Sequence, residues 1–193
     1  MKDTFSILGG IIFLFGFIPY TLAILKPKQG QKRAEPSKAT WLIWATLDVL
    51  TLIALYQKDA LNGQIIGATI GATTIFILSL KYGISVWTKL DIFSLLGAVI
   101  GIVIWAITSN AVLALSCFVA VGVLGALPTF YNTWQDPSKE NRTAWLFYFI
   151  SCPLTLLGLK SWTFSVYISP VAFTAIETIM IFILFIRPRM LKK

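Results

Sequence analysis

The sequence contains no histidine, only two cysteines and few charged residues. Charged residues make up 12% of its 193 residues, against about a quarter in an average soluble domain. Without histidine, the usual zinc sites and histidine-based acid–base catalysis are excluded. Cys117 and Cys152 both lie in apolar stretches, where cysteine acts as a small hydrophobe. We therefore expect no disulfide, no metal and no cofactor.

Apolar sequence, by contrast, is abundant: 57% of the residues are hydrophobic and the mean hydropathy is +0.81. Seven apolar stretches have about the 17–25 residues that a membrane-crossing helix needs. They lie at 5–25, 40–57, 62–80, 90–108, 110–130, 143–160 and 164–186. Only helices and closed barrels satisfy the backbone inside lipid, and the alternation of a barrel strand is missing. We therefore predict an all-α integral membrane protein with seven transmembrane helices.

The basic residues are distributed unevenly between the two ends of these helices. Thirteen of the sixteen fall on the face that receives the first, third and fifth loops and the C-terminus; the other face holds Lys2, Lys58 and Lys160. Since Lys and Arg accumulate on the cytoplasmic side, we predict an external N-terminus and a cytoplasmic C-terminus. This topology explains the net charge of +8 without nucleic acid binding. With no cleavable or retention signal, we expect a bacterial inner membrane.

The two halves of the chain repeat one another. Three landmarks recur in the same order: Gly16-x-x-Pro19 and Gly125-x-x-Pro128, Pro36-Ser37-Lys38 and Pro137-Ser138-Lys139 (each followed by Trp-Leu), and Ile-Phe-Ile-Leu at 75–78 and 181–184. This predicts one three-helix repeat at 1–81 and another at 110–193. Because three is odd, a linker helix at 82–109 is needed to make the repeats parallel, as in one class of secondary transporters.

The second helix of each repeat presents a matching face. Each face carries an aromatic ring, a polar or ionisable group and a threonine at helical spacing: Trp44, Asp48 and Thr51 in one, and Tyr148, Cys152 and Thr155 in the other. Such faces suit a small-solute pocket between the repeats, although simple packing of Trp44 and Tyr148 stays open. Trp41 and Trp145 lie a turn nearer the membrane boundary, where tryptophan collects, and we expect them to anchor there.

Two carboxylates are expected near the middle of the membrane. Asp48 lies roughly 10 Å and Glu177 roughly 15 Å from the cytoplasmic ends of their helices, at 1.5 Å per residue, and no Lys or Arg lies at similar depth. Intramembrane acids are functional sites by default. We expect each to be protonated or to face water, a cation or a polar solute. A structural acid, hydrogen-bonded inside the bundle, is the alternative.

On these features the chain resembles the SWEET and PQ-loop transporter superfamily, whose architecture the nicotinamide-riboside-type vitamin transporters share. The Pro-Gln pair of the PQ-loop subgroup is replaced here by Pro19-Tyr20 and Pro128-Thr129. The resemblance implies that Pro19 and Pro128 act as hinges, and that aromatic residues on the second helix of each repeat line the site.

The resemblance also implies that the third helix of each repeat contacts the solute, through an amide in the sugar carriers. The matching positions here are Gly71 and Glu177, so an acid replaces the amide. An acid favours a cationic or amine-bearing solute, or proton coupling. Pro153 interrupts the helix predicted at 143–160; it is either a hinge or an ordinary kink.

We therefore predict a small-solute transporter that binds between the repeats and alternates its access. The alternative is a non-transporting membrane receptor or assembly subunit with the same bundle. No nucleophile–base spacing is present, so an enzyme is the least expected class. The expected partners are the solute and the lipid bilayer. A glycine ladder at Gly63, Gly67 and Gly71 permits close helix packing or, equally, a face for a homo-oligomer.

Overall fold

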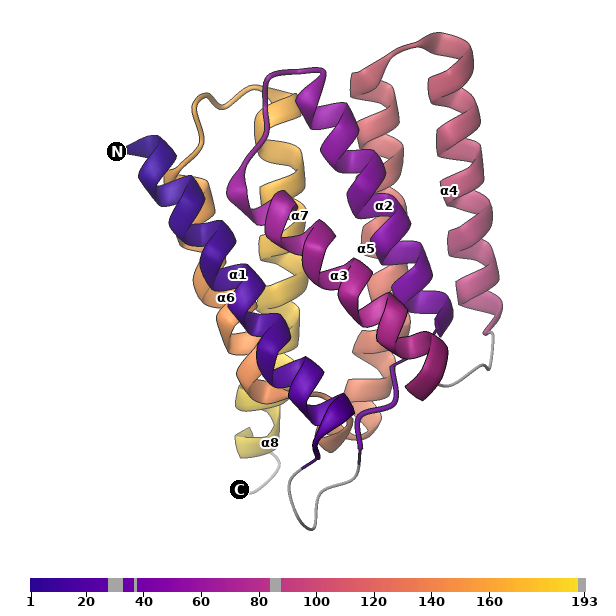
Figure 1. Ribbon diagram of the computed structural model, residues 1–193, viewed down its shortest axis with the longest axis vertical. Helices are drawn as coiled ribbons and strands as arrows, with labels where there is room; N and C mark the ends of the chain where they lie inside the picture. Colours follow the sequence, from indigo (N-terminus) through magenta and orange to yellow (C-terminus); the bar gives the residue numbers. More distant parts are fainter. Residues whose placement is uncertain (28–32, 37, 84–87, 191–193) are drawn as a thin grey trace.

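The computed structural model describes residues 1–27, 33–36, 38–83 and 88–190, and within them every regular element is a helix (Figure 1). The long helices are α1 (Lys2–Leu25), α2 (Lys38–Tyr56), α3 (Gly63–Tyr82), α4 (Lys89–Thr108), α5 (Ala111–Gln135), α6 (Arg142–Leu157) and α7 (Phe164–Ile181). A 3-10 turn, η1 (Pro137–Lys139), precedes α6, and a π-helical turn, η2 (Phe182–Ile186), continues α7 into α8 (Arg187–Met190). All seven predicted segments are helical.

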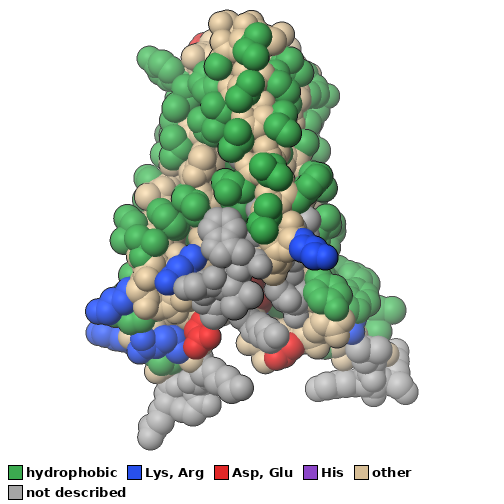
Figure 2. Space-filling model, turned by 90° about the vertical axis from the view of Figure 1, so that its right-hand side faces the viewer, with side chains coloured by type: hydrophobic (Ala, Val, Ile, Leu, Met, Phe, Trp, Pro, Cys, Tyr) green, Lys and Arg blue, Asp and Glu red, His purple; other side chains and the backbone are tan. Residues whose placement is uncertain are grey.

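Four of these helices, α1, α3, α5 and the α7–α8 run, are long and apolar enough to cross a membrane; the described parts of α2 and α4 include shorter apolar stretches. Large apolar side chains are exposed along the flanks of the bundle. In the view of Figure 2 hydrophobic side chains are spread along the height of the bundle, while most of the charged side chains gather at the lower end. These features identify a helical membrane protein. The N- and C-termini lie at opposite ends of the bundle (Figure 1).

Asparagines begin, and glycines end, helices α3 and α6. The side chain of Asn62 accepts a hydrogen bond from the backbone N–H of Ile65 and caps α3, and Asn141 accepts one from the N–H of Ala144 and caps α6. Such caps satisfy donors that the first turn of a helix leaves free. Helices α3 and α6 stop at Gly83 and Gly158.

The helices pack in two sets that meet along two contacts. Helix α3 packs against both α1 and α2, and α7 packs against both α5 and α6. Across the middle, α1 packs on α6 and α2 packs on α5. Helix α4 packs mainly against α5, at the edge of the bundle (Figure 1).

Glycines bring α1 into backbone contact with its neighbours at the end that carries the N-terminus. A Cβ atom on Gly10 would overlap the backbone of Gly63, one on Gly9 would lie 2.6 Å from Oγ1 of Thr155, and one on Gly158 would lie 2.6 Å from the backbone N of Ser6. The hydroxyl of Ser6 also accepts a hydrogen bond from the N–H of Gly63 at 2.9 Å. We call this contact of α1 with α3 and α6 the seal.

We predict that Gly10→Ala lowers the melting temperature by several degrees. Alanine by itself favours a helix over glycine by about 1 kcal/mol, but the added methyl meets rigid backbone, and overpacking costs about 1–3 kcal/mol. Gly122→Ala is the matched control, because a Cβ on Gly122 meets nothing within 4 Å, and it should leave stability unchanged or slightly raised. Thermal unfolding in detergent measures both; equal melting temperatures would contradict the tight contact.

Candidate functional site

A cavity of about 1770 Å³ enters the bundle from the end opposite the seal. Charged residues surround its opening, which we call the mouth: Lys26, Arg33, Glu35, Asp136, Glu140 and Arg142. Further in, the lining includes the polar side chains of Asp48, Thr51, Tyr148, Ser169 and Glu177 among aromatic rings. The walls come from both sets of helices, so the cavity lies between them.

The structure brings most of the predicted site residues together. Trp44, Asp48 and Thr51 of α2, Tyr148 of α6 and Glu177 of α7 all line this cavity. Helical spacing placed the first three on one face of α2, and that face borders the cavity. The two acids that the sequence singled out therefore border the same space.

Two predicted site residues lie outside the cavity lining, within the part of the chain that the structure describes. Gly71 faces the ring of Phe17, which leaves no room for a Cβ atom, so it lets α1 approach α3. Cys152 is 1% exposed; its Sγ donates to the carbonyl of Tyr148 at 3.4 Å and lies 3.6 Å from Nε2 of Gln64. Both residues pack helices together.

The expectation that Trp41 and Trp145 anchor at the membrane boundary is wrong. They are 7% and 5% exposed, and both line the cavity. Their rings contact the next aromatic residue along the same helix, with centroids 5.3 Å apart for Trp41 and Trp44 and 5.7 Å for Trp145 and Tyr148. The signal was present in the sequence, because a residue three positions from a cavity residue shares its helical face.

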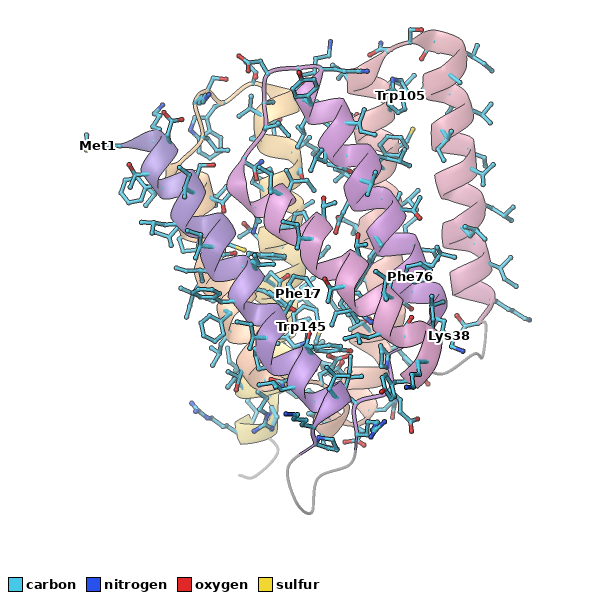
Figure 3. The ribbon with its side chains drawn as sticks, in the orientation of Figure 1. Met1, Phe17, Lys38, Phe76, Trp105 and Trp145 are labelled. Atoms are coloured by element: carbon cyan, nitrogen blue, oxygen red, sulfur yellow. The ribbon has the colours of Figure 1, made fainter. Side chains whose placement is uncertain are left out.

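Four phenylalanines also line the cavity and were missed: Phe13, Phe17, Phe118 and Phe173. The ring of Phe13 lies 4.7 Å from Tyr148 and 5.5 Å from Phe173, and the ring of Phe17 lies 5.0 Å from Tyr148. Figure 3 shows Phe17 and Trp145 inside the bundle, toward the end with the mouth. Phenylalanine is ordinary in a transmembrane helix, so composition carried no signal for these positions.

Two polar atoms beside these rings are buried without a partner in the described part of the chain. They are the hydroxyl oxygen of Tyr148 and Oε2 of Glu177, on residues that are 5% and 3% exposed. Leaving a buried polar group unpaired costs about 1–3 kcal/mol, and such groups in native structures call for an explanation. Both residues border the cavity, which makes them candidates for contact with a polar solute.

At the mouth, the side chain of Glu140 is hydrogen-bonded to Trp145. Its Oε2 accepts a hydrogen bond from Nε1 of Trp145 at 2.9 Å. Burial raises the pKa of the Glu140 carboxyl to about 7, against the lowering effect of the Trp145 bond. The next residue, Asn141, donates from Nδ2 to the carbonyl of Pro19 at 3.2 Å, which ties this loop to α1. Sequence reasoning did not single out Glu140, since it lies between helices.

Prolines lie inside several of the helices around the cavity. Pro19 is within α1 and Pro153 within α6, as the hinge prediction requires. Pro128 falls in the span of α5, and its side chain lies outside the described part of the structure. The sequence reading missed Pro170, which is buried inside α7. Thr174 and Thr178 bond their own helix backbone, as transmembrane threonines usually do.

Compared with known proteins, the chain matches no protein-family model, and it matches no curated protein at a significant level.

We predict that Glu140 makes stability fall as the pH rises toward 7. Its pKa in the folded protein, about 7, is above its ordinary value of 4.5, so the folded state binds more protons between these values. The contribution is therefore fully present below about pH 4.5 and is lost as the pH rises through about 7. Melting temperatures of wild type and Glu140→Gln, measured from pH 4 to 8, give the difference. A difference that does not change with pH would contradict the prediction.

Proposed function

We propose that the chain is a small-solute transporter that binds its solute between the two sets of helices and alternates its access. One observation carries the proposal: a cavity runs from a charged mouth into the bundle, where it reaches the unpartnered Tyr148 and Glu177. A largely apolar, aromatic pocket with a few converging polar groups is typical of small-molecule sites.

The packing of the helices supports the parallel-repeat arrangement, 3-1-3, with a first repeat at 1–81, a linker at 82–109 and a second repeat at 110–193. Exchanging α1 with α5, α2 with α6 and α3 with α7 turns every principal contact among these six helices into another that is present: α1–α6 becomes α5–α2, and α1–α3 becomes α5–α7. Helix α4 has no counterpart. This pattern is that of the SWEET and PQ-loop superfamily, to which we assign the chain as a proposal.

In this reading the structure represents one of two access states. The seal closes the end that carries the N-terminus, and the cavity is open at the other end. Because basic residues gather at the open end, we take that end as cytoplasmic and the membrane as a bacterial inner membrane. The cycle exchanges the closed and open ends, with bending at Pro19, Pro153 and Pro170.

The chemistry of the cavity favours a solute that carries an amine or another cationic group. Asp48 and Glu177 supply carboxyl groups, and the lysines and arginines among the described lining residues lie at the mouth. Aromatic faces attract cations by about 0.5–2 kcal/mol each, and the rings around Tyr148 are available for that contact. Proton uptake by the same acids is the other use that their position supports.

We predict that an amine-bearing solute stabilises the wild type but neither Asp48→Asn nor Glu177→Gln. A ligand that binds only the folded state raises the melting temperature by mass action, by an amount equivalent to about 2.7 kcal/mol at a hundred times its Kd. The panel contains polyamines, basic amino acids, sugars and vitamins. Asp59→Asn is the control, because Asp59 is an exposed acid in the loop after α2. Uptake of the stabilising solute into proteoliposomes then tests transport itself.

A stabilising solute that is not taken up would argue for the receptor alternative. If no solute in the panel stabilises the protein, and both acid variants are at least as stable as the wild type, Asp48 and Glu177 are structural. The transporter proposal then fails.

A further inference from the structure

We infer that Glu140 is a proton-binding site that controls closure of the mouth. This inference rests on the transport cycle proposed above, because that cycle requires the mouth to close. It adds a third acid to Asp48 and Glu177 and places a proton outside the membrane-spanning part of the chain, in the loop between η1 and α6.

The carboxyl of Glu140 is half-buried and has few polar contacts. It accepts one hydrogen bond, from the Trp145 indole. Among the described side chains the only ion pair is Lys160–Asp3, at the opposite end of the bundle. Among the described residues, burial raises the pKa of Glu140 and the Trp145 bond lowers it. The other charged or titratable groups that line the mouth are Tyr20 of α1, Lys26 just after α1, Arg33 and Glu35 before α2, Asp136 before η1, and Arg142 of α6.

Closing the mouth must remove water from this carboxyl. Burying a charge without an ion partner costs far more than burying a neutral, hydrogen-bonded acid. The carboxylate therefore opposes closure, and a proton on Glu140 removes that opposition. The physical effect is one of desolvation, so it requires no new partner for Glu140 in the closed state.

The position of Glu140 links the mouth to the deeper site. Its partner Trp145 contacts the ring of Tyr148, whose hydroxyl is one of the two unpartnered atoms beside the cavity. Hydrogen bonds to an ionised group are roughly twice as strong as neutral ones, so protonation loosens the hold on the Trp145 indole. The adjacent Asn141 holds Pro19 of α1, so movement of this loop is transmitted to both helices that flank the opening.

The described part of the first half differs at the matching position. Trp41, the counterpart of Trp145, packs against the ring of Tyr20 with centroids 5.4 Å apart. In the ungapped repeat alignment, Pro36 stands where the second half has Glu140. Proton control at the mouth is therefore expected from the second half alone.

The test measures proton binding and closure separately. Infrared difference spectra between about pH 5 and about pH 8 follow protonated carboxyl groups in wild type and in Glu140→Gln. We expect one carboxyl that titrates near pH 7 and is absent from the variant. Trp145→Phe keeps Glu140 but removes the hydrogen bond that stabilises its ionised form, so it should shift this titration to higher pH. Glu35→Gln, another acid at the mouth, should change nothing.

Closure is read from labelling of a cysteine at the mouth by a water-soluble maleimide. Thr143→Cys places the thiol at an exposed position on the cavity lining. The labelling rate of Thr143→Cys is divided by that of Ser161→Cys, an exposed position at the other end. The ratio cancels the effect of pH on the ionisation of the thiol. We expect the ratio to fall several-fold from about pH 8 to about pH 6, with its midpoint where Glu140 titrates, and to be independent of pH with Glu140→Gln.

The inference is overturned if Glu140→Gln removes no titrating carboxyl, or if the labelling ratio has the same pH dependence in wild type and variant. Both results are independent of any solute. Solute uptake whose pH profile is unchanged by Glu140→Gln would leave the transporter proposal standing and refute this one. Titration and closure as expected, without a bound solute, would support the proton site while the transport proposal fails.

Discussion

Helix α1 approaches α3 and α6 to backbone contact because glycines stand at the crossing points. Between helices in a membrane there is little hydrophobic driving force, so close packing of small residues supplies much of the association. Here that packing is concentrated near Gly10, Gly63 and Gly158, at one end of the bundle. The cavity opens at the opposite end, where α1 meets α6 through Gly16 and Tyr148 and through the hydrogen bond from Asn141 to Pro19. The backbone contacts of the glycines therefore mark the end away from the mouth.

The cavity combines two environments that place different demands on polar groups. At the mouth, charged side chains remain near water, and half-buried Glu140 accepts a hydrogen bond from Trp145. Deeper in, aromatic rings surround Tyr148 and Glu177, whose polar atoms have no partner in the described chain. An unpaired polar atom in an apolar setting is costly. Native proteins retain such an atom at functional sites, for example where it binds a solute or a proton.

Several features could be predicted because they depend on local sequence alone. Runs of apolar residues define the helices, and the charge asymmetry predicts which ends lie together. Asp48 and Glu177 stand out because a carboxyl is expensive in lipid wherever the helix turns it. The alignment of the halves also predicted the matching faces of Trp44 and Tyr148, since residues three or four apart share a face in any α-helix.

Other features were decided only by tertiary packing. A glycine in a ladder contacts whichever helix reaches it, so only the structure shows that Gly71 accommodates Phe17 while Asp48 borders a cavity. Phe13 and Phe173 join the lining because helices from distant parts of the chain meet there, and Trp145 turns inward because Glu140 accepts its N–H. The sequence by itself determined the helices and their buried acids, because hydrophobic periodicity and desolvation act on each segment alone. The tertiary structure decided which of those residues share a cavity, since that depends on contacts between segments far apart in the chain.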